Sequence, residues 1–429
     1  MSGKIILKNG RILDPSCGRD ELGSLFIDQG VVVEPFLEGD ADSVVEVGPD
    51  CWICPGFIDS MVHLCEPGMT SRETVETGTT AAAAGGFTGL VNMPGNQPAT
   101  DEVHRLIWIQ QRAADRAVVT VHQTATVSRG MEGKLLAPIG SLHRAGAVAL
   151  TDHQCSLQDN ELMRRALEYA SMFDIPILDH CRDESLSPGG LMHEGYWSVL
   201  LGLRGWPAIA EEMMVARNVL MAEMTRARLH CLRITTEGSI RLIREAKERQ
   251  VTVTAGATPH HLLLDDSSLS GYQTIYKVDP PLRSEKDVAA LRRAVKDGVV
   301  DFLCSDHAPT CGYEKEVEFD DAPFGAPGLE TAVGATLTAL VHGEGVSPLA
   351  FCALWSTRVS DYFRLGRGSL QLGRPADVTV VNPRLEWIVD PSRFVGKSKM
   401  SPFAGRSFKG RAICTLVQGR VVWQDMNHQ

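Results

Sequence analysis

The stretch that decides the fold is Pro55-Gly56-Phe57-Ile58-Asp59-Ser60-Met61-Val62-His63-Leu64-Cys65-Glu66-Pro67-Gly68. It begins as an apolar strand and ends among polar side chains. Alternate residues of a strand point the same way, so Met61 and His63 share a face. A His-x-His pair at these positions would give two imidazoles to one metal ion. Met61 stands first instead, and its thioether is a poor substitute for imidazole at a hydrolytic zinc ion.

The same kind of apolar run recurs along the middle of the chain. Eight runs predict strands, at 56–59, 89–93, 118–127, 147–152, 176–180, 228–234, 251–257 and 301–306. Helical patterns lie between most of them, at 77–84, 160–171, 208–226, 239–249 and 285–296. Eight strands alternating with helices predict an α/β fold, a (β/α)8 barrel of the TIM type.

Both ends of the chain are rich in short strands. Residues 1–54 contain strand patterns split by turn signals such as Lys8-Asn9-Gly10, and the C-terminal part has similar runs at 376–381, 412–417 and 419–423. We therefore expect a small β-sandwich domain made from residues 1–54 and 366–429, and a barrel domain at residues 55–365.

Composition excludes several classes of function. The 429 residues carry a formal net charge of -11, whereas a nucleic-acid partner normally requires a basic face. No run of about 18 apolar residues predicts a membrane span, and the first residues lack the apolar core of a signal peptide. The 11 cysteines are scattered and mostly lie inside apolar runs. We expect a cytoplasmic protein that binds neither nucleic acid nor membrane.

Polar residues gather at the carboxyl ends of the predicted strands, which is where barrel enzymes build their active sites. They are Asp59, His63, Asn92, Asp152, His153, His180, Arg233, His260, Asp306 and His307. Of these, His63, Asp152, His180 and Asp306 are nitrogen and oxygen donors suited to zinc. Asp306 after the last strand could also take a proton from a metal-bound water, as a general base does.

The order of the motifs resembles that of bacterial dihydroorotases, members of the amidohydrolase superfamily. The motifs are Gly56-Phe57-Ile58-Asp59 with His63, Glu66-Pro67-Gly68, Gly85-Gly86-Phe87-Thr88, Thr258-Pro259-His260-His261, Pro280-Pro281-Leu282-Arg283 and Asp306-His307-Ala308-Pro309. The resemblance runs from the first strand to Gly419. It implies an amidohydrolase-type barrel with a small sandwich, and an ancestry in the hydrolysis of cyclic amides.

The resemblance also implies a degenerate zinc site. His63, Asp152, His180 and Asp306 stand at that family's metal-ligand positions, whereas Met61 and Arg233 stand where it has ligand histidines. An arginine is permanently cationic and cannot coordinate zinc. Arg233 could instead pair with Asp152 or Asp306 and so supply the positive charge that a metal would bring.

The substrate side of the site departs from the family as well. Cys65 replaces an arginine that faces the substrate carboxylate, and Gly95 replaces an asparagine that contacts the substrate. Asp279 stands where the family has an asparagine before Pro-Pro-Leu-Arg, and Thr310 replaces the last histidine of Asp-His-Ala-Pro-His. His307 remains where the family contacts substrate. Asp306 and His307 are thus interpreted as remnants of a catalytic base and a substrate contact.

Two hypotheses follow. In the first, the chain is a noncatalytic dihydroorotase-like subunit of pyrimidine biosynthesis, a pseudoenzyme. It resembles dihydroorotase-like chains that are assembly partners of aspartate transcarbamoylase, and we expect a homo-oligomer without a cofactor. In the second, it is an active zinc-dependent dihydroorotase or related cyclic amidohydrolase with at most one zinc ion. That ion would bind His63, Asp152 and Asp306, or Asp152 and His180, with His153, His230 or a cysteine replacing a missing ligand.

Overall fold

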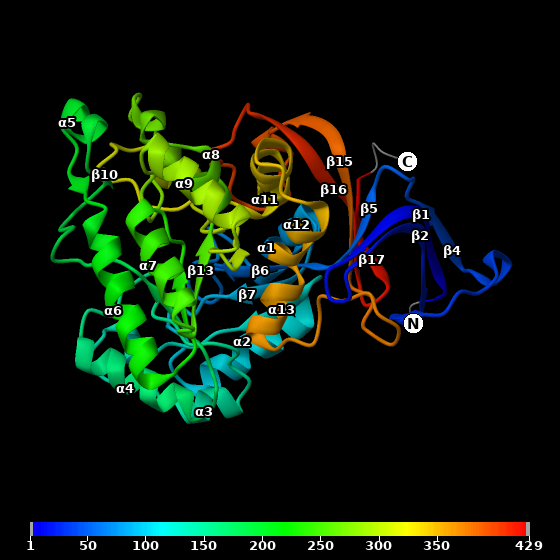
Figure 1. The fold of residues 1–429 in the computed structure, drawn as a ribbon, viewed down its shortest axis with the longest axis horizontal. Helices are drawn as coiled ribbons and strands as arrows, with labels where there is room; N and C mark the ends of the chain where they lie inside the picture. The colour runs from blue at the N-terminus through cyan, green and yellow to red at the C-terminus, as the bar shows by residue number, and fades with distance from the viewer. Residues whose placement is uncertain (1–2, 426–429) are drawn as a thin grey trace.

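The computed structural model describes residues 3–425, which form a barrel surrounded by helices and a β-sheet beside it (Figure 1). The barrel strands are β6 (Phe57–Val62), β7 (Phe87–Asn92), β8 (Thr120–Gln123), β9 (Ile177–His180), β12 (Leu229–Leu232), β13 (Val253–Ala257) and β14 (Phe302–Leu303). They pair in parallel within two groups, β6-β7-β8 and β9-β12-β13-β14. The predicted barrel is confirmed, although several strands are shorter than their apolar runs.

The two groups of strands close into a ring through single bridges. On one side Val62 bridges His307 in parallel, and the His63 amide donates to the His307 carbonyl at 2.9 Å. On the other side Leu150 bridges both Ala125 and Ile177. The prediction of a regular strand over 147–152 is wrong. Residues 148–151 complete the ring through backbone hydrogen bonds to 123–125 and 176–178, but the only bridges form at Leu150. Asp152 beyond them bonds to a neighbouring loop.

Helices cover the outside of the barrel. The larger ones are α1 (Val75–Gly85), α2 (Val103–Arg116), α4 (Asn160–Ser171), α6 (Ile209–Thr225), α7 (Glu237–Glu248), α9 (Glu285–Lys296), α11 (Leu329–Thr336), α12 (Pro348–Trp355) and α13 (Thr357–Phe363). Shorter ones are α3 (Ile139–Arg144), α5 (Tyr196–Leu201), α8 (Pro259–Leu263) and α10 (Gly312–Lys315). In α9, Ser284 caps the first turn by accepting from the Asp287 amide. No helix within residues 3–425 is long and apolar enough to cross a membrane.

The two ends of the chain meet in one eight-stranded sheet. Its order is β17-β16-β15-β5-β1-β2-β3, with β4 paired to β1. The strands are β1 (Ile5–Asp14), β2 (Arg19–Asp28), β3 (Val31–Val33), β4 (Ser43–Glu46), β5 (Trp52–Pro55), β15 (Val378–Ile388), β16 (Ser407–Val417) and β17 (Arg420–Gln424). Antiparallel pairing of β5 with β15 joins the N-terminal strands to the C-terminal ones. β5 leads directly into β6, so this sheet fixes the start of the barrel.

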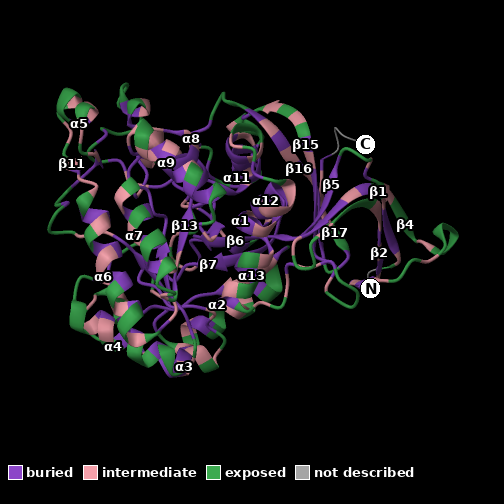
Figure 2. Ribbon diagram, in the orientation of Figure 1, coloured by how far each residue is buried: buried purple, intermediate pink, exposed green. Residues whose placement is uncertain are grey.

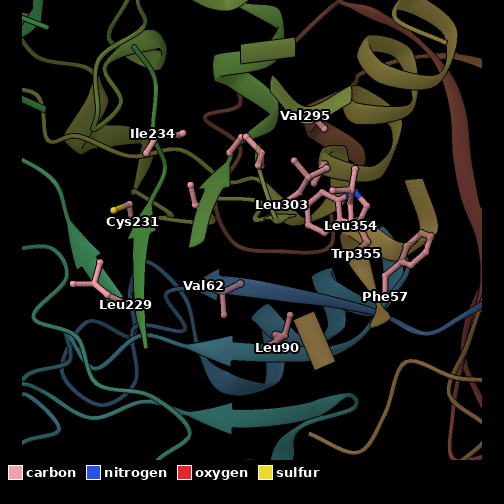
Figure 3. Close-up of a cluster of buried hydrophobic side chains, with 14 of the residues drawn as sticks. Phe57, Val62, Leu90, Leu229, Cys231, Ile234, Val295, Leu303, Leu354 and Trp355 are labelled. Carbon is pink, nitrogen blue, oxygen red and sulfur yellow. The ribbon is translucent and has the colours of Figure 1, made fainter. Parts of the chain in front are cut away.

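The main core lies between the barrel strands and the surrounding helices. Figure 2 shows the strands buried and the outer helix faces exposed. Phe57, Val62 and Leu90 of the first strands lie in the same buried cluster as Leu303 and Trp355 (Figure 3). A second cluster fills the barrel interior and includes Met61. Packing thus supports the strand ends, where the polar residues emerge.

Candidate functional site

Arg233 lies at the centre of the polar cluster, just past the end of β12, with a left-handed backbone (φ 46°). Its Nη1 donates to Asp306 Oδ1 at 2.7 Å, and both side chains are only 3% exposed. Its Nη2 donates to His153 Nε2 and to His180 Nδ1, the latter at 3.2 Å. One guanidinium therefore connects the ends of three barrel strands and a loop, at the position where the sequence resemblance implies a metal-ligand histidine.

Contacts around Arg233 fix the roles of the neighbouring ring nitrogens. Because His153 accepts at Nε2, its Nδ1 carries the proton and donates to His63 Nε2 at 3.1 Å. His180 likewise accepts at Nδ1, and its Nε2 lies 2.9 Å from Asp279 Oδ1. His260 Nε2 lies 3.3 Å from Asp306 Oδ2. The cluster is thus a chain of rings and carboxylates organised by one arginine.

The electrostatics agree with this arrangement. Burial opposes ionisation of Asp306, but the Arg233 charge and the hydrogen bond from His260 outweigh it and lower the pKa of Asp306. Burial, reinforced by Arg233, lowers the pKa of His153 well below its usual value. Burial also lowers the pKa of His63 to about 4, with Asp306 opposing the shift. His63 and His153 are therefore neutral imidazoles near neutral pH, beside the ionised Arg233–Asp306 pair.

Asp152 does not belong to this chain of contacts. Its Oδ1 accepts from the amides of Val127 and Ser128, at 2.8 and 3.0 Å, and its Oδ2 accepts from the Ser128 hydroxyl. The prediction that Arg233 pairs with an acidic neighbour is confirmed for Asp306 and wrong for Asp152. The reason is local, because the loop after β8 supplies enough donors to satisfy the Asp152 carboxylate before the guanidinium is reached.

At the other positions where the resemblance implies different residues, Met61 and Cys65 are buried and Gly95 is partly buried. Met61 is fully buried and belongs to the apolar cluster inside the barrel. The Cys65 thiol lies 3.6 Å from the His63 carbonyl oxygen, and burial raises the pKa of Cys65 to about 12. At Gly95, an added Cβ would lie 3.2 Å from the His153 carbonyl oxygen, so little room remains there for a larger side chain.

His307 keeps an ordered position at the same face. Its Nδ1 accepts from the Gly328 amide at 3.2 Å, and its Nε2 lies 3.6 Å from Glu73 Oε2. Glu73 is fully buried, and the pKa of Glu73 is lowered because the contacts with His307 and Thr77 outweigh its burial. His307 is therefore held by the protein itself, with one ring nitrogen occupied by backbone and the other facing a carboxylate.

A pocket of about 370 Å³ opens above the cluster. It is lined by Arg72, His153, Gln154, Arg233, Asp279, Asp306, Ala308, Pro323, Phe324 and Gly325. At its rim Arg72 pairs with Glu314, from the segment after β14, at 2.5 Å. Both cations in the lining, Arg72 and Arg233, are therefore already neutralised by carboxylates. The resemblance implies an arginine at position 65 that would bind the substrate carboxylate, but this chain has Cys65 there. The lining of this pocket offers no unpaired cation in its place.

The donor set does not fit a metal ion as it is arranged. Across residues 3–425, no three His, Cys, Asp or Glu side chains converge in a way that could hold one. His180 and Asp306 direct atoms at Arg233, Asp152 faces the Ser128 loop, and Met61 is packed into the core. His230 is not placed to replace a missing ligand, because its ring bonds to Thr254 and stacks on Phe302. The guanidinium occupies the position around which ligands would have to gather.

Sequence reasoning missed some of the residues that build this site. Glu73, Arg72 and Ser128 lie in loops or at a helix start, and no strand-end pattern indicated them. His153 was considered as a replacement zinc ligand, whereas the structure shows it in contact with both His63 and Arg233. The Asp279 position was noted as a departure from the family. Its pairing with His180, which lowers the pKa of Asp279 to about 2 against the effect of burial, depends on the fold.

Known proteins similar in fold include hydantoinases. The L-hydantoinase (dihydropyrimidinase) of Arthrobacter aurescens superposes with a TM-score of 0.88 at 23% identity, covering 99% of this chain and 96% of that one. The dihydropyrimidinase of Brevibacillus agri gives a TM-score of 0.85 at 22% identity, covering 98% and 95%. At these identities the likeness establishes the fold alone, an α/β barrel with a sheet made from both termini.

Other known proteins have a higher sequence identity to this chain than these solved structures do. The Dihydro-orotase-like family profile matches residues 51–239. A dihydroorotase of Pelotomaculum thermopropionicum is 44% identical over 423 residues, which cover 98% of this chain and 99% of that protein. A dihydroorotase of Syntrophus aciditrophicus is 42% identical over 430 residues, covering 98% and 100%. This chain belongs to the dihydroorotase-like family.

Proposed function

We propose that this chain is a noncatalytic dihydroorotase-like protein of pyrimidine biosynthesis in which Arg233 takes the place of the catalytic metal. The observation that carries the proposal is the 2.7 Å contact between Arg233 Nη1 and Asp306 Oδ1 inside the former metal site. A guanidinium has only donors and stays protonated, so it can satisfy Asp306, His153 and His180 but cannot activate a water molecule as zinc does.

The same contact also weakens the remaining base. A general base works best when its pKa lies near the working pH. Burial favours the neutral acid at Asp306, but Arg233 and His260 lower its pKa further below that range. Both Asp306 oxygens are engaged, one by Arg233 and one near His260. Asp306 is better suited to holding the strand ends together than to accepting a proton from water.

As the role of such a protein we propose assembly with the catalytic chain of aspartate transcarbamoylase. Support comes from what is retained and what is replaced. The chain is similar to dihydroorotases over 98% of its length. In contrast, Met61, Cys65, Gly95 and Arg233 all stand where the resemblance implies metal or substrate contacts. Selection on a scaffold and not on turnover explains this combination. Co-elution of the two purified proteins in gel filtration, compared with each alone, tests the partner.

A second candidate function is an active dihydroorotase with an altered site that holds one zinc ion. The observation that favours it is the name of the relatives, which are called dihydroorotases at 44% and 42% identity over nearly the whole chain. For this function the Arg233 side chain would have to leave Asp306 or His180, and Asp152 would have to turn away from Ser128. The ion could then bind His63, Asp152 and Asp306, or Asp152 and His180. Leaving Asp306 breaks a buried ion pair, which costs about 3–5 kcal/mol.

Zinc content and dihydroorotate hydrolysis, measured on the same chelator-treated and zinc-reconstituted sample, distinguish the two functions. The noncatalytic protein contains little zinc and gives no turnover. Stoichiometric zinc, with turnover that Asp306→Asn abolishes, would establish the second function and overturn the first. Assaying with excess zinc matters, because a weakly bound ion lost in purification would otherwise imitate the first outcome.

Restoring the family residues gives a positive test of the same idea. The variant Met61→His, Arg233→His, Cys65→Arg and Gly95→Asn should bind zinc measurably better than the native chain in calorimetric titration. The matched control keeps Arg233 and carries the other three changes, and should gain no zinc affinity. Equal affinity in both variants would show that Arg233 is not what blocks the metal. The Gly95 change is also tested alone, since its Cβ crowds the His153 carbonyl.

A further inference from the structure

Asp279 places a charged carboxylate in the pocket above the Arg233 cluster. It precedes Pro280 in the segment before α9, and its side chain is 18% exposed. Burial opposes its ionisation, but His180, Arg233 and Arg182 together lower the pKa of Asp279 to about 2. The carboxylate is therefore negatively charged near neutral pH. The sequence resemblance implies a neutral asparagine at this position, so the charge is a departure that changes the character of the pocket.

The two oxygens of this carboxylate are poorly supplied with donors. Oδ1 is buried and lies 2.9 Å from His180 Nε2, but no donor reaches it in good hydrogen-bond geometry. Oδ2 accepts no hydrogen bond from the described residues 3–425. A largely buried ionised carboxylate needs donors or a cation, and leaving it without them is unfavourable. Because Oδ1 is buried, a ligand in the pocket would meet this carboxylate at Oδ2.

The other carboxylate and guanidinium groups of the lining are matched in pairs. Arg72 pairs with Glu314 at the rim, and Arg233 pairs with Asp306 at the base. Asp279 is then the one charged residue of the lining that has no charged partner in contact within the part of the chain that the structure describes. The pocket therefore carries an excess of one negative charge.

The neighbouring histidines and cations do not cancel this charge. His153 accepts from Arg233 at Nε2 and His180 accepts from it at Nδ1, so both rings are neutral. Arg182 lowers the pKa of Asp279 from a distance, but it is not part of the lining. Its guanidinium stacks on Trp206, 3.9 Å from the ring centroid. A cation that enters the pocket therefore competes with no side chain for Asp279.

The rest of the lining offers apolar surface. Ala308, Pro323 and Phe324 are partly exposed there. Gly325 has a φ of 112°, and a Cβ at this position would lie 2.6 Å from the Ala308 carbonyl oxygen, so no side chain can narrow the pocket here. Lys277 lies over part of the Phe324 ring, 5.0 Å from its centroid, but it is buried and outside the lining. A pocket of about 370 Å³ with such walls suits a small flat molecule.

We propose that this pocket binds a small flat organic cation of the amidinium class, which donates N–H to Asp279 and packs its apolar body against Phe324 and Pro323. Two opposite charges in a partly buried site attract each other more strongly than a charge attracts a neutral amide. A carboxylate ligand would instead meet the excess negative charge. The inference rests on the proposed function in one respect, because Arg233 must stay paired with Asp306 and leave neither group to a metal ion or an anion.

Three probes of one shape separate the effect of charge from the effect of fit. Benzamidinium, benzamide and benzoate share a planar ring and are respectively positive, neutral and negative at neutral pH. In calorimetric titrations of the full, chelator-treated chain, benzamidinium should bind about 10-fold or more tighter than benzamide. Benzoate should show no measurable binding. Benzamidinium that binds no tighter than benzamide, or not at all at millimolar concentration, would overturn the proposal without any variant.

Variants assign the preference to particular residues. Asp279→Asn should lower the affinity for benzamidinium to that for benzamide, because the amide keeps the shape and removes the charge. The control Glu168→Gln removes one negative charge from the exposed surface of α4 and should leave all three affinities unchanged. Phe324→Ala should weaken benzamidinium and benzamide by similar factors, since both use the same ring. A folded Asp279→Asn chain, established by circular dichroism, that keeps the native affinity for benzamidinium would overturn the role of Asp279.

Zinc content and dihydroorotate turnover, measured on the same sample, separate this inference from the proposed function. Little zinc and no turnover, combined with binding of benzoate as tight as that of benzamidinium, would overturn the inference and leave the noncatalytic function in place. Stoichiometric zinc with turnover would overturn the proposed function, and with it the charge balance from which the inference starts. Little zinc, no turnover and a clear preference for benzamidinium that is lost in Asp279→Asn is the result that both expect.

Discussion

A single side chain, Arg233, determines the charge balance at the carboxyl end of this barrel. We expect Arg233→Met to lower the free energy of unfolding by about 3–5 kcal/mol, because the variant leaves the Asp306 carboxylate buried without its cation. Urea denaturation followed by circular dichroism measures the loss. The combined variant Arg233→Met, Asp306→Asn removes both charges and should recover a large part of it.

An exposed arginine gives the matched control for this prediction. Arg164 pairs with Glu161 and Glu168 on the surface of α4, and Arg164→Met should cost less than about 1 kcal/mol. Equal losses at positions 164 and 233 would contradict the view that the buried pair holds the site together. A combined Arg233→Met, Asp306→Asn variant no more stable than Arg233→Met alone would also contradict it.

A second residue, His230, makes stability depend on pH. Burial lowers the pKa of His230 to about 3, so the folded chain keeps this ring neutral while the unfolded chain protonates it below about pH 6.5. The unfolded state then binds more protons, and stability falls as the pH drops from about 6.5 towards 3. For this group alone the loss by pH 5 should be about 2 kcal/mol.

The variant His230→Gln should show a shallower acid-side loss of stability, because glutamine can still bond to Thr254 and does not titrate. The measurement is the free energy of unfolding between pH 7 and 5. His104→Gln, at an exposed histidine, is the control and should follow the native curve. Superimposable curves for His230→Gln and the native chain would mean that other groups cause the acid sensitivity, such as His122, whose pKa burial lowers to about 4.

The sequence was enough to show which residues of the candidate site are unusual, but not which residues they contact. Arg233 and Met61 stand out because a cation and a thioether replace imidazoles at positions defined by motif order. The pairing of Arg233 with Asp306 and not with Asp152 could not be read, because it depends on Ser128 and Val127, which come from a loop distant in sequence. Glu73 was missed for the same reason. Its contact with His307 is made only once the barrel has closed.

At the scale of elements, strong hydrophobic periodicity was enough to predict where two helices begin and end. The helices predicted at 160–171 and 285–296 have the observed bounds, because each begins at a capping side chain, Asp159 or Ser284. The apolar run at 147–152 gave a wrong prediction, because its composition is typical of a buried strand. Its backbone bonds to both neighbouring segments, but it forms isolated bridges at Leu150 and no continuous ladder. A run of apolar residues predicts burial, whereas a ladder also needs two neighbouring strands in register, which sequence alone does not supply.

This segment should depend on the loop that holds Asp152. Ser128→Ala removes a hydroxyl donor from a buried carboxylate, and we expect a loss of about 2 kcal/mol in the free energy of unfolding. Amide exchange over residues 148–153 should accelerate more than exchange in β9 or β12, because their ladders remain. Ser171→Ala, at an exposed serine bonded only within α4, is the control. Uniform acceleration throughout the barrel would instead indicate a global effect.

At the scale of the whole molecule, the terminal sheet and the barrel are joined by buried hydrogen bonds. Thr379 in β15 accepts from the Phe57 amide at 3.0 Å and donates to the Gly86 carbonyl at 2.6 Å. Thr415 in β16 donates to the Ala83 carbonyl at 2.7 Å, at the end of α1. These contacts connect strands from the C-terminal part of the chain to the first strand and helix of the barrel. The two parts should therefore unfold together.

Thr379→Val tests this coupling, because valine has the same shape and leaves the Phe57 amide and the Gly86 carbonyl buried without that partner. We expect a loss of about 2–4 kcal/mol and one calorimetric transition, shifted as a whole to lower temperature. Thr80→Val, which removes a hydroxyl bonded only to Glu76 in its own helix, should shift the transition little. Two resolved transitions in the native chain would contradict the coupling. If Thr379→Val separates one transition into two, the threonine contacts are what makes the sheet and the barrel a single cooperative unit.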